Sequence, residues 1–91
     1  MIEIDGRKYK LLKNYKDAFN IADLEDRITD YFYDFDYILG DYAYGKVRLK
    51  GFNNKDNKNF SSINDYEKIE EYINNCCAYD CKYFVLQSLN K

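Results

Sequence analysis

The sequence contains no histidine, the side chain whose charge changes most readily near neutral pH. Proton transfer in a catalytic site would therefore fall to carboxylates or thiols. A glycine-rich phosphate loop and a serine nucleophile elbow are also missing, because Gly40, Gly45 and Gly51 are dispersed through one short segment. We therefore predict a protein without enzymatic activity and expect no cofactor.

Long apolar runs are missing as well. The first ten residues, MIEIDGRKYK, do not resemble a signal peptide. Nowhere does the chain approach the roughly 20 consecutive apolar residues of a membrane span. We expect a cytoplasmic protein with no membrane contact.

Cysteine is scarce and clustered, with Cys76, Cys77 and Cys81 lying within six residues. Adjacent cysteines bridge only with strain, and the odd count leaves one thiol unpaired, so reduced cysteines are favoured. Three thiolates could contribute to a zinc site, but without histidine the fourth ligand would have to come from Asp80 or a partner chain. We therefore interpret the cysteines as small buried residues between a helix and a strand and predict no metal.

The residues that are present are sufficient for a folded core. The 91 residues are 46% hydrophobic and include 11 tyrosines and 6 phenylalanines, unlike a disordered segment. No linker divides the chain, so we predict a single domain over residues 1–91. The net charge of −2 argues against a generic nucleic-acid binder. Charge nevertheless alternates in blocks, basic over 1–17 and 42–60 and acidic over 22–41 and 61–80.

Hydrophobic periodicity predicts five strands and two helices in the order ββαββαβ. Asp5-Gly6 favours a tight turn between the first two strands, and apolar residues at spacings of three and four indicate amphipathic helices. Asn20 is a plausible N-cap for the first helix, and Ser62 with Asp65 resembles a capping box for the second. The predicted strands cover 1–4, 7–13, a hairpin at 37–52 and a buried run at 82–89, and the helices cover 20–35 and about 62–73.

This order predicts an α+β fold with a small, mostly antiparallel sheet and two amphipathic helices packed on one face. Basic residues fall mostly on strands and acidic residues mostly on helices. The open face of the sheet is therefore expected to be positive and the helical layer negative. The polar run at 53–59 is expected to be a solvated loop.

The hairpin at 37–52 holds the most concentrated basic patch. Side chains alternate along a strand, so its three cations share one face, and two tyrosines precede them. Such a surface could stack bases and bind phosphates, or it could be a solvated sheet face whose cations pair with acidic residues. The Gly-Asp pair could also simply hold the turn. The candidate binding residues are Asp41, Tyr42, Tyr44, Lys46, Arg48 and Lys50.

Three segments carry a resemblance to a known family. The segment DYILGDYAYGKVRLKGF at 36–52 resembles the hallmark of the YutD-like family, small proteins of low-GC Gram-positive bacteria with no assigned function. Residues 2–20 and 76–86 resemble the family's N-terminus and its cysteine-flanked final strand, and together the three cover about half of the chain. Tyr42 stands where we expect tryptophan in relatives. The resemblance supports the fold and implies no reaction or ligand.

Two functional hypotheses follow. The first is a non-catalytic interaction module that binds a protein partner or a second copy of itself. The alternative is an accessory or regulatory protein that binds RNA or DNA through the basic face of the hairpin at 37–52. The sequence does not specify the partner or the oligomeric state.

Overall fold

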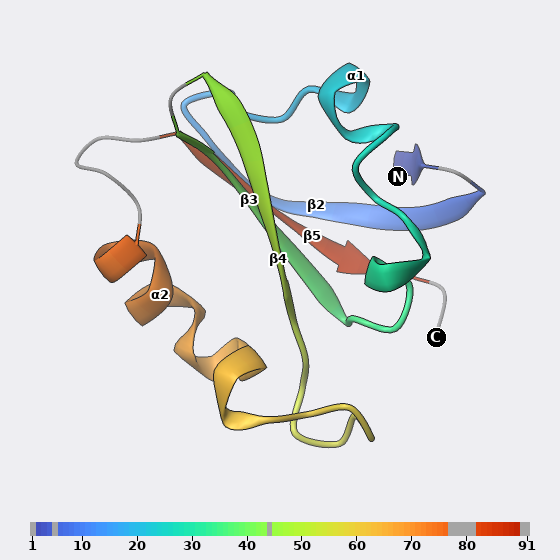
Figure 1. The fold of residues 1–91 in the computed structure, drawn as a ribbon, viewed down its shortest axis with the longest axis vertical. Helices are drawn as coiled ribbons and strands as arrows, with labels where there is room; N and C mark the ends of the chain where they lie inside the picture. Colours follow the sequence, from blue (N-terminus) through green and yellow to red (C-terminus); the bar gives the residue numbers. More distant parts are fainter. Residues whose placement is uncertain (1, 5, 44, 77–81, 90–91) are drawn as a thin grey trace.

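The computed structural model describes residues 2–4, 6–43, 45–76 and 82–89. Two strands are followed by a short helix, two more strands, a second helix and a last strand (Figure 1). Three 3₁₀ turns, η1 to η3, lie between these elements. The bounds are β1 (Ile2–Ile4), β2 (Arg7–Tyr15), α1 (Ile21–Leu24), η1 (Asp30–Phe32), β3 (Tyr37–Ala43), β4 (Lys46–Phe52), η2 (Ser62–Asn64), η3 (Tyr66–Lys68), α2 (Ile69–Cys76) and β5 (Tyr83–Ser88).

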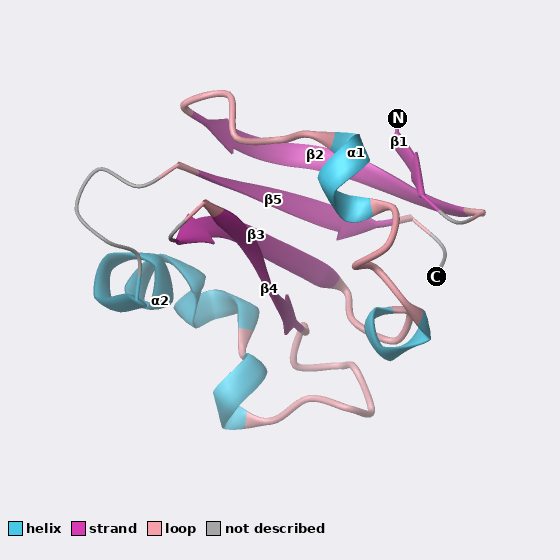
Figure 2. Cartoon of the chain, turned by 45° about the horizontal axis from the view of Figure 1, so that its top comes forward, coloured by secondary structure: helices cyan, strands magenta, loops and turns pink. Residues whose placement is uncertain are grey.

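The five strands form one sheet in the order β1-β2-β5-β3-β4, and every pair of neighbouring strands is antiparallel. The prediction of an α+β fold built on an antiparallel sheet is confirmed. Strand β5 lies in the centre, as its apolar run predicts, because Phe84, Val85 and Leu86 are all buried. Strands β1 and β4 form the two edges (Figure 2).

The predicted hairpin at 37–52 is formed by β3 and β4. Its register runs without a bulge from Tyr37 opposite Phe52 to Ala43 opposite Lys46. The intervening turn has Gly45 at φ +76°, a left-handed conformation that glycine adopts without steric cost. The alternation of polar and apolar residues was therefore a correct guide to this part of the chain.

The predicted helix at 20–35 is wrong in its extent. Asn20 is the N-cap, and its side chain accepts a hydrogen bond from the backbone N–H two residues on, but α1 is only four residues long. Thr29 has an extended backbone (φ −107°, ψ −177°), which separates α1 from η1. A continuous helix would also place Asp26 and Asp30 one turn apart, where like charges repel.

The predicted second helix also begins later than expected. Its first residues form η2 and η3, and the α-helix itself starts at Ile69. The capping box is formed by Ser61 and Asn64 rather than by Ser62 and Asp65. Asp65 instead caps η3, accepting a hydrogen bond from the N–H of Glu67 at 3.0 Å.

The two helices pack on opposite faces of the sheet, which corrects the prediction of a single helical layer. Successive residues of a strand point to opposite faces, and the two buried clusters divide β3 and β5 accordingly. The sheet therefore lacks the fully open positive face that the charge pattern suggested. The α1 face includes Leu24, Ile28, Ile38, Phe84 and Leu86, whereas the α2 face includes Leu39, Phe52, Ile69, Ile73 and Val85.

Candidate functional site

The three cations of the hairpin lie on β4 and share the α2 face of the sheet. Lys46, Arg48 and Lys50 alternate along the strand with Val47 and Leu49, which face α1. The structure thus brings the basic candidates together in one row. Their individual environments, however, differ.

Arg48 is bound to Asp41. The two residues are direct cross-strand partners of β4 and β3. Arg48 Nη2 donates to Asp41 Oδ2 at 2.6 Å, and Arg48 Nε donates to Asp41 Oδ1 at 3.1 Å. The carboxylate is only 5% exposed, whereas the arginine side chain is 52% exposed. A bidentate arginine compensates the burial of the carboxylate, so this guanidinium already has an anionic ligand within the chain.

Lys50 lies among aromatic rings. Its Nζ is 5.3 Å from the ring centroid of Phe52 and 5.4 Å from that of Tyr72, distances at which a cation is attracted to a π face. A cavity of about 240 Å³ adjoins it, lined partly by the Asp41–Arg48 pair and by Tyr72. Lys46, at the start of β4, is exposed.

Tyr42 lies on the other face of the sheet, away from the three cations. Its hydroxyl donates to Asp23 Oδ2 at 2.8 Å, and Lys82 Nζ lies 4.5 Å from its ring centroid. Burial and the hydrogen bond to Asp23 together raise the pKa of Tyr42 to about 12. Tyr44 lies outside the described residues. The structure therefore separates Tyr42 from the basic row that it was predicted to join.

Two glycines of the hairpin are required by ring packing. A Cβ added at Gly40 would fall within 3.0 Å of the ring of Phe84, and one added at Gly51 would fall equally close to the ring of Phe35. Contacts this short are not tolerated by packed side chains. These two glycines thus allow aromatic rings to lie directly on the hairpin, and neither is needed for the turn itself.

A hollow with several aromatic side chains lies along the outer edge of β4, and sequence reasoning missed it. It measures about 400 Å³, and we call it the β4 groove. Tyr31 and Ile63, which are 70% and 77% exposed, are the two most exposed large hydrophobic residues of the described chain. Both had been assigned to helix faces, and the one sequence signal was Gly51, since a glycine within a strand can mark a close approach. The groove is lined by Tyr31, Phe32, Phe35, Leu49, Lys50, Gly51, Ile63, Asn64 and Tyr72.

The polar run at 53–59 is only partly the solvated loop that was expected. Asn53 is fully buried, and its Oδ1 accepts hydrogen bonds from the N–H of Asp36 at 2.9 Å and from Asn57 Nδ2 at 3.1 Å. The remainder of the run is mostly exposed. A single asparagine thus connects this loop to the residue that precedes β3.

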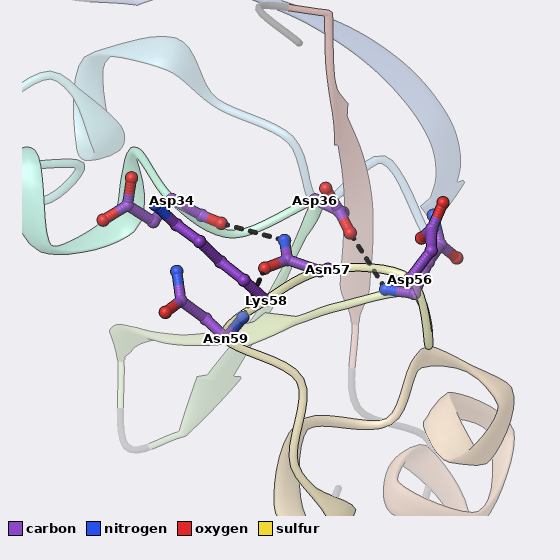
Figure 3. Close-up of a pocket in the computed structure, with 7 residues that line it drawn as sticks. Asp34, Asp36, Asp56, Asn57, Lys58 and Asn59 are labelled. Atoms are coloured by element: carbon purple, nitrogen blue, oxygen red, sulfur yellow. Dashed lines mark hydrogen bonds between the residues drawn. The ribbon is translucent and has the colours of Figure 1, made fainter.

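Further hydrogen bonds shape a polar pocket of about 410 Å³ beside this asparagine (Figure 3). Asn57 Nδ2 donates to the carbonyl oxygen of Asp34 at 3.2 Å, and its Oδ1 accepts from the N–H of Asn59 at 2.8 Å. The N–H of Asn54 donates to the carboxylate of Asp36 at 2.9 Å. These bonds fix the loop that follows β4 against the segment that enters β3.

In the sequence, the candidate metal ligands begin at the last residue of α2. Cys77 and Cys81 lie outside the described residues, and α2 ends at Cys76. Within the described ranges, no group of three acidic or cysteine side chains is arranged to hold a metal ion. No helix in the same ranges is long and apolar enough to span a membrane.

Comparisons with known proteins agree with the resemblance of the hairpin. The chain belongs to the YutD-like family, described as "Putative antitoxin YutD-like", whose model matches residues 3–87. It is 37% identical to the protein named "Putative antitoxin YutD" of Bacillus subtilis (strain 168), over the full length of both chains. It is also similar to the solution NMR structure of protein yutD from B. subtilis, with a TM-score of 0.79, covering 100% of this chain and 83% of that one.

Proposed function

We propose that this chain is a non-catalytic binding protein that neutralises a protein partner, in the manner that the name of its Bacillus subtilis relative implies. The relative matches over its entire length, so the whole chain and not an isolated segment corresponds to the protein named "Putative antitoxin YutD". The proposed mode of action is occupation of a toxin protein, which requires a binding surface and no catalytic group. The partner is accordingly a protein.

The β4 groove is the observation that carries this proposal. The two most exposed large hydrophobic side chains of the described residues, Tyr31 and Ile63, come from separate segments and line the same hollow. Apolar side chains gathered around a concave surface are typical of a protein-binding site, whereas single exposed apolar residues need no explanation. Tyrosine is also among the residues that contribute most to protein interfaces.

RNA or DNA binding by the hairpin is the alternative, and it has less support. In its favour, Lys46, Arg48 and Lys50 share one face of β4. Against it, Arg48 is held by Asp41, and Tyr42, which this alternative would use to stack on bases, lies on the opposite face with its hydroxyl bonded to Asp23. The net charge is also negative.

The direct test is affinity capture from the native host followed by a growth assay. The tagged chain, produced at its natural level, is recovered with and without ribonuclease treatment. A recovered protein that arrests growth when expressed alone, and that ceases to do so when this chain is co-expressed, supports the proposal. Recovery that disappears with ribonuclease supports the nucleic-acid alternative instead.

A matched pair of variants connects the result to the surface. Tyr31→Ser with Ile63→Ser removes the exposed apolar side chains of the β4 groove. Leu12→Ser with Leu89→Ser removes two exposed apolar side chains elsewhere. The first pair should abolish growth rescue and the second should leave it intact. Equal rescue by both pairs would refute a role for the groove.

A further inference from the structure

Strand β4 has an open edge. It is seven residues long and pairs only with β3 among the strands that the structure describes. The opposite edge strand, β1, has only three residues. An open strand edge presents backbone N–H and C=O groups that can pair with another extended chain. Figure 2 shows β4 as the outermost strand on its side of the sheet.

Backbone pairing on this edge already occurs just beyond the end of β4. The N–H of Asn53 donates to the carbonyl of Asn64 at 2.7 Å, and the N–H of Tyr66 donates to the carbonyl of Asn53 at 3.0 Å. Asn53 therefore directs both backbone groups away from β3. Because backbone groups alternate between the two edges of a strand, Gly51, Leu49 and Val47 direct theirs outward as well.

The β4 groove has this edge as its floor. Leu49, Lys50 and Gly51 belong to the floor, while Tyr31 and Ile63 come from the segments that flank it. In strand addition, main-chain hydrogen bonds supply affinity and flanking pockets for alternate side chains supply specificity. The groove provides both features.

The charged side chains of β4 determine which kind of added strand can pair with it. Lys46 and Lys50 project on the α2 face on either side of Arg48, which is already paired with Asp41, and Val47 and Leu49 project on the α1 face. Opposite charges directly across two strands are favourable and like charges are unfavourable. An added strand with acidic side chains on the α2 face and apolar side chains on the α1 face would complement β4.

The same charges disfavour a second copy of this chain. Antiparallel pairing of two β4 strands about a two-fold axis at Leu49 would place Arg48 of one copy opposite Lys50 of the other. An axis at Arg48 would place Lys46 opposite Lys50 and one Arg48 opposite the other. Both registers juxtapose like charges, which is how natural edge strands avoid self-association.

We infer that β4 receives an extended segment of the protein partner, in which acidic and apolar residues alternate, as an additional antiparallel strand of the sheet. This inference rests on the proposed function, because it assigns the surface and the chemistry of the partner's contact. The added strand spans the outward-facing groups of Val47, Leu49 and Gly51 and ends where the chain's own segment at 64–66 pairs with Asn53.

The test uses a fluorescent peptide in which glutamate and valine alternate, and measures its binding to the intact chain by fluorescence anisotropy. A peptide of the same composition with its glutamates in one block is the control. Two further peptides carry N-methyl groups on alternate residues, one peptide on its valines (one phase) and the other on its glutamates (the other phase). Only one phase directs its N–H groups toward β4, so one N-methylated peptide should lose binding and the other should keep it.

Reversing the charges of β4 tests whether they favour an acidic partner strand. The double variant Lys46→Glu, Lys50→Glu should have about tenfold lower affinity for the Glu-Val peptide and should bind a peptide in which lysine and valine alternate. Lys10→Glu with Lys58→Glu, which reverses two exposed lysines outside β4, is the control of equal charge change and should leave both affinities unchanged.

Equal binding of the alternating and blocked peptides, or of the two N-methylated peptides, would overturn the inference. The inference would also be overturned if no peptide bound the chain while the captured partner bound the wild type and the Lys46→Glu, Lys50→Glu variant with equal affinity. That last result leaves the proposed function standing, whereas failure to recover any growth-arresting partner contradicts the proposed function itself.

Discussion

Gly40 and Phe84 lie directly opposite each other on the neighbouring strands β3 and β5, with the phenyl ring packed against the glycine backbone. Phe84 is fully buried, and its ring occupies the space that a side chain at position 40 would need. Phe35 bears the same relation to Gly51 on β4. The glycines of the hairpin thus form part of the packing that fixes β4 and its groove in place.

Gly40→Ala should destabilise the protein by about 1–3 kcal/mol, because the new methyl group overlaps the ring of Phe84. The measurement is urea denaturation followed by far-UV circular dichroism. Adding Phe84→Leu to Gly40→Ala should cost less than the sum of the two single changes, since the smaller side chain relieves the overlap. An unchanged denaturation midpoint for Gly40→Ala would show that the ring moves aside freely.

Arg48→Met should destabilise the fold by about 1–2 kcal/mol, because it leaves the buried carboxylate of Asp41 without its charged partner. The expected loss is below the roughly 3–5 kcal/mol of a fully buried pair, since half of the arginine side chain is in water. Asp41→Asn combined with Arg48→Met should recover part of the loss. If thermal denaturation shows the double variant to be the less stable one, the carboxylate has a structural role apart from Arg48.

Tyr42 should ionise at a pKa of about 12, above the usual value of 10.0. The folded state favours the neutral phenol, so this side chain stabilises the fold fully below pH 10, and that contribution is lost as pH rises through 12. NMR titration with ring-labelled tyrosine, assigned by comparison with Tyr42→Phe, measures the ionisation directly. The variant should also show a weaker loss of stability between pH 10 and 12. A normal phenol pKa would contradict the bond to Asp23.

Asn53→Ala should cost about 1–3 kcal/mol, because it removes a buried side chain that accepts two hydrogen bonds, from the N–H of Asp36 and from Asn57 Nδ2. Asn74→Ala, in an exposed position on α2, is the control and should change stability by less than about 0.5 kcal/mol. Chemical denaturation of both variants measures the difference. Equal stabilities would mean that water replaces the lost amide without cost.

The strands could be predicted from the sequence, and the helices only in part. Alternation around Gly45 and the apolar run at 83–86 are local signals, and both correspond to observed strands. The residues of 20–35 have helical spacing because they pack on the sheet, yet Thr29 is extended and most of the segment is not helical. Periodicity reports which residues are buried and does not by itself report the backbone conformation.

The candidate site could be predicted only where it is local in the chain. Period two along β4 places Lys46, Arg48 and Lys50 on one face, but nothing in the sequence shows that Asp41 binds Arg48. Tyr31 and Ile63 meet at the β4 groove because α1 and α2 pack on opposite faces of the sheet. That arrangement is a tertiary property, and the sequence pattern favoured one helical face.

The most direct measurement of the central claim is the affinity of the purified growth-arresting partner for the chain and its two matched variants. Isothermal titration should show that Tyr31→Ser with Ile63→Ser lowers the affinity at least roughly 30-fold, while Leu12→Ser with Leu89→Ser leaves it unchanged. Both variants should remain folded, as circular dichroism can check, because each of the four side chains is at least 36% exposed. An unchanged affinity for the first variant would contradict binding through the β4 groove.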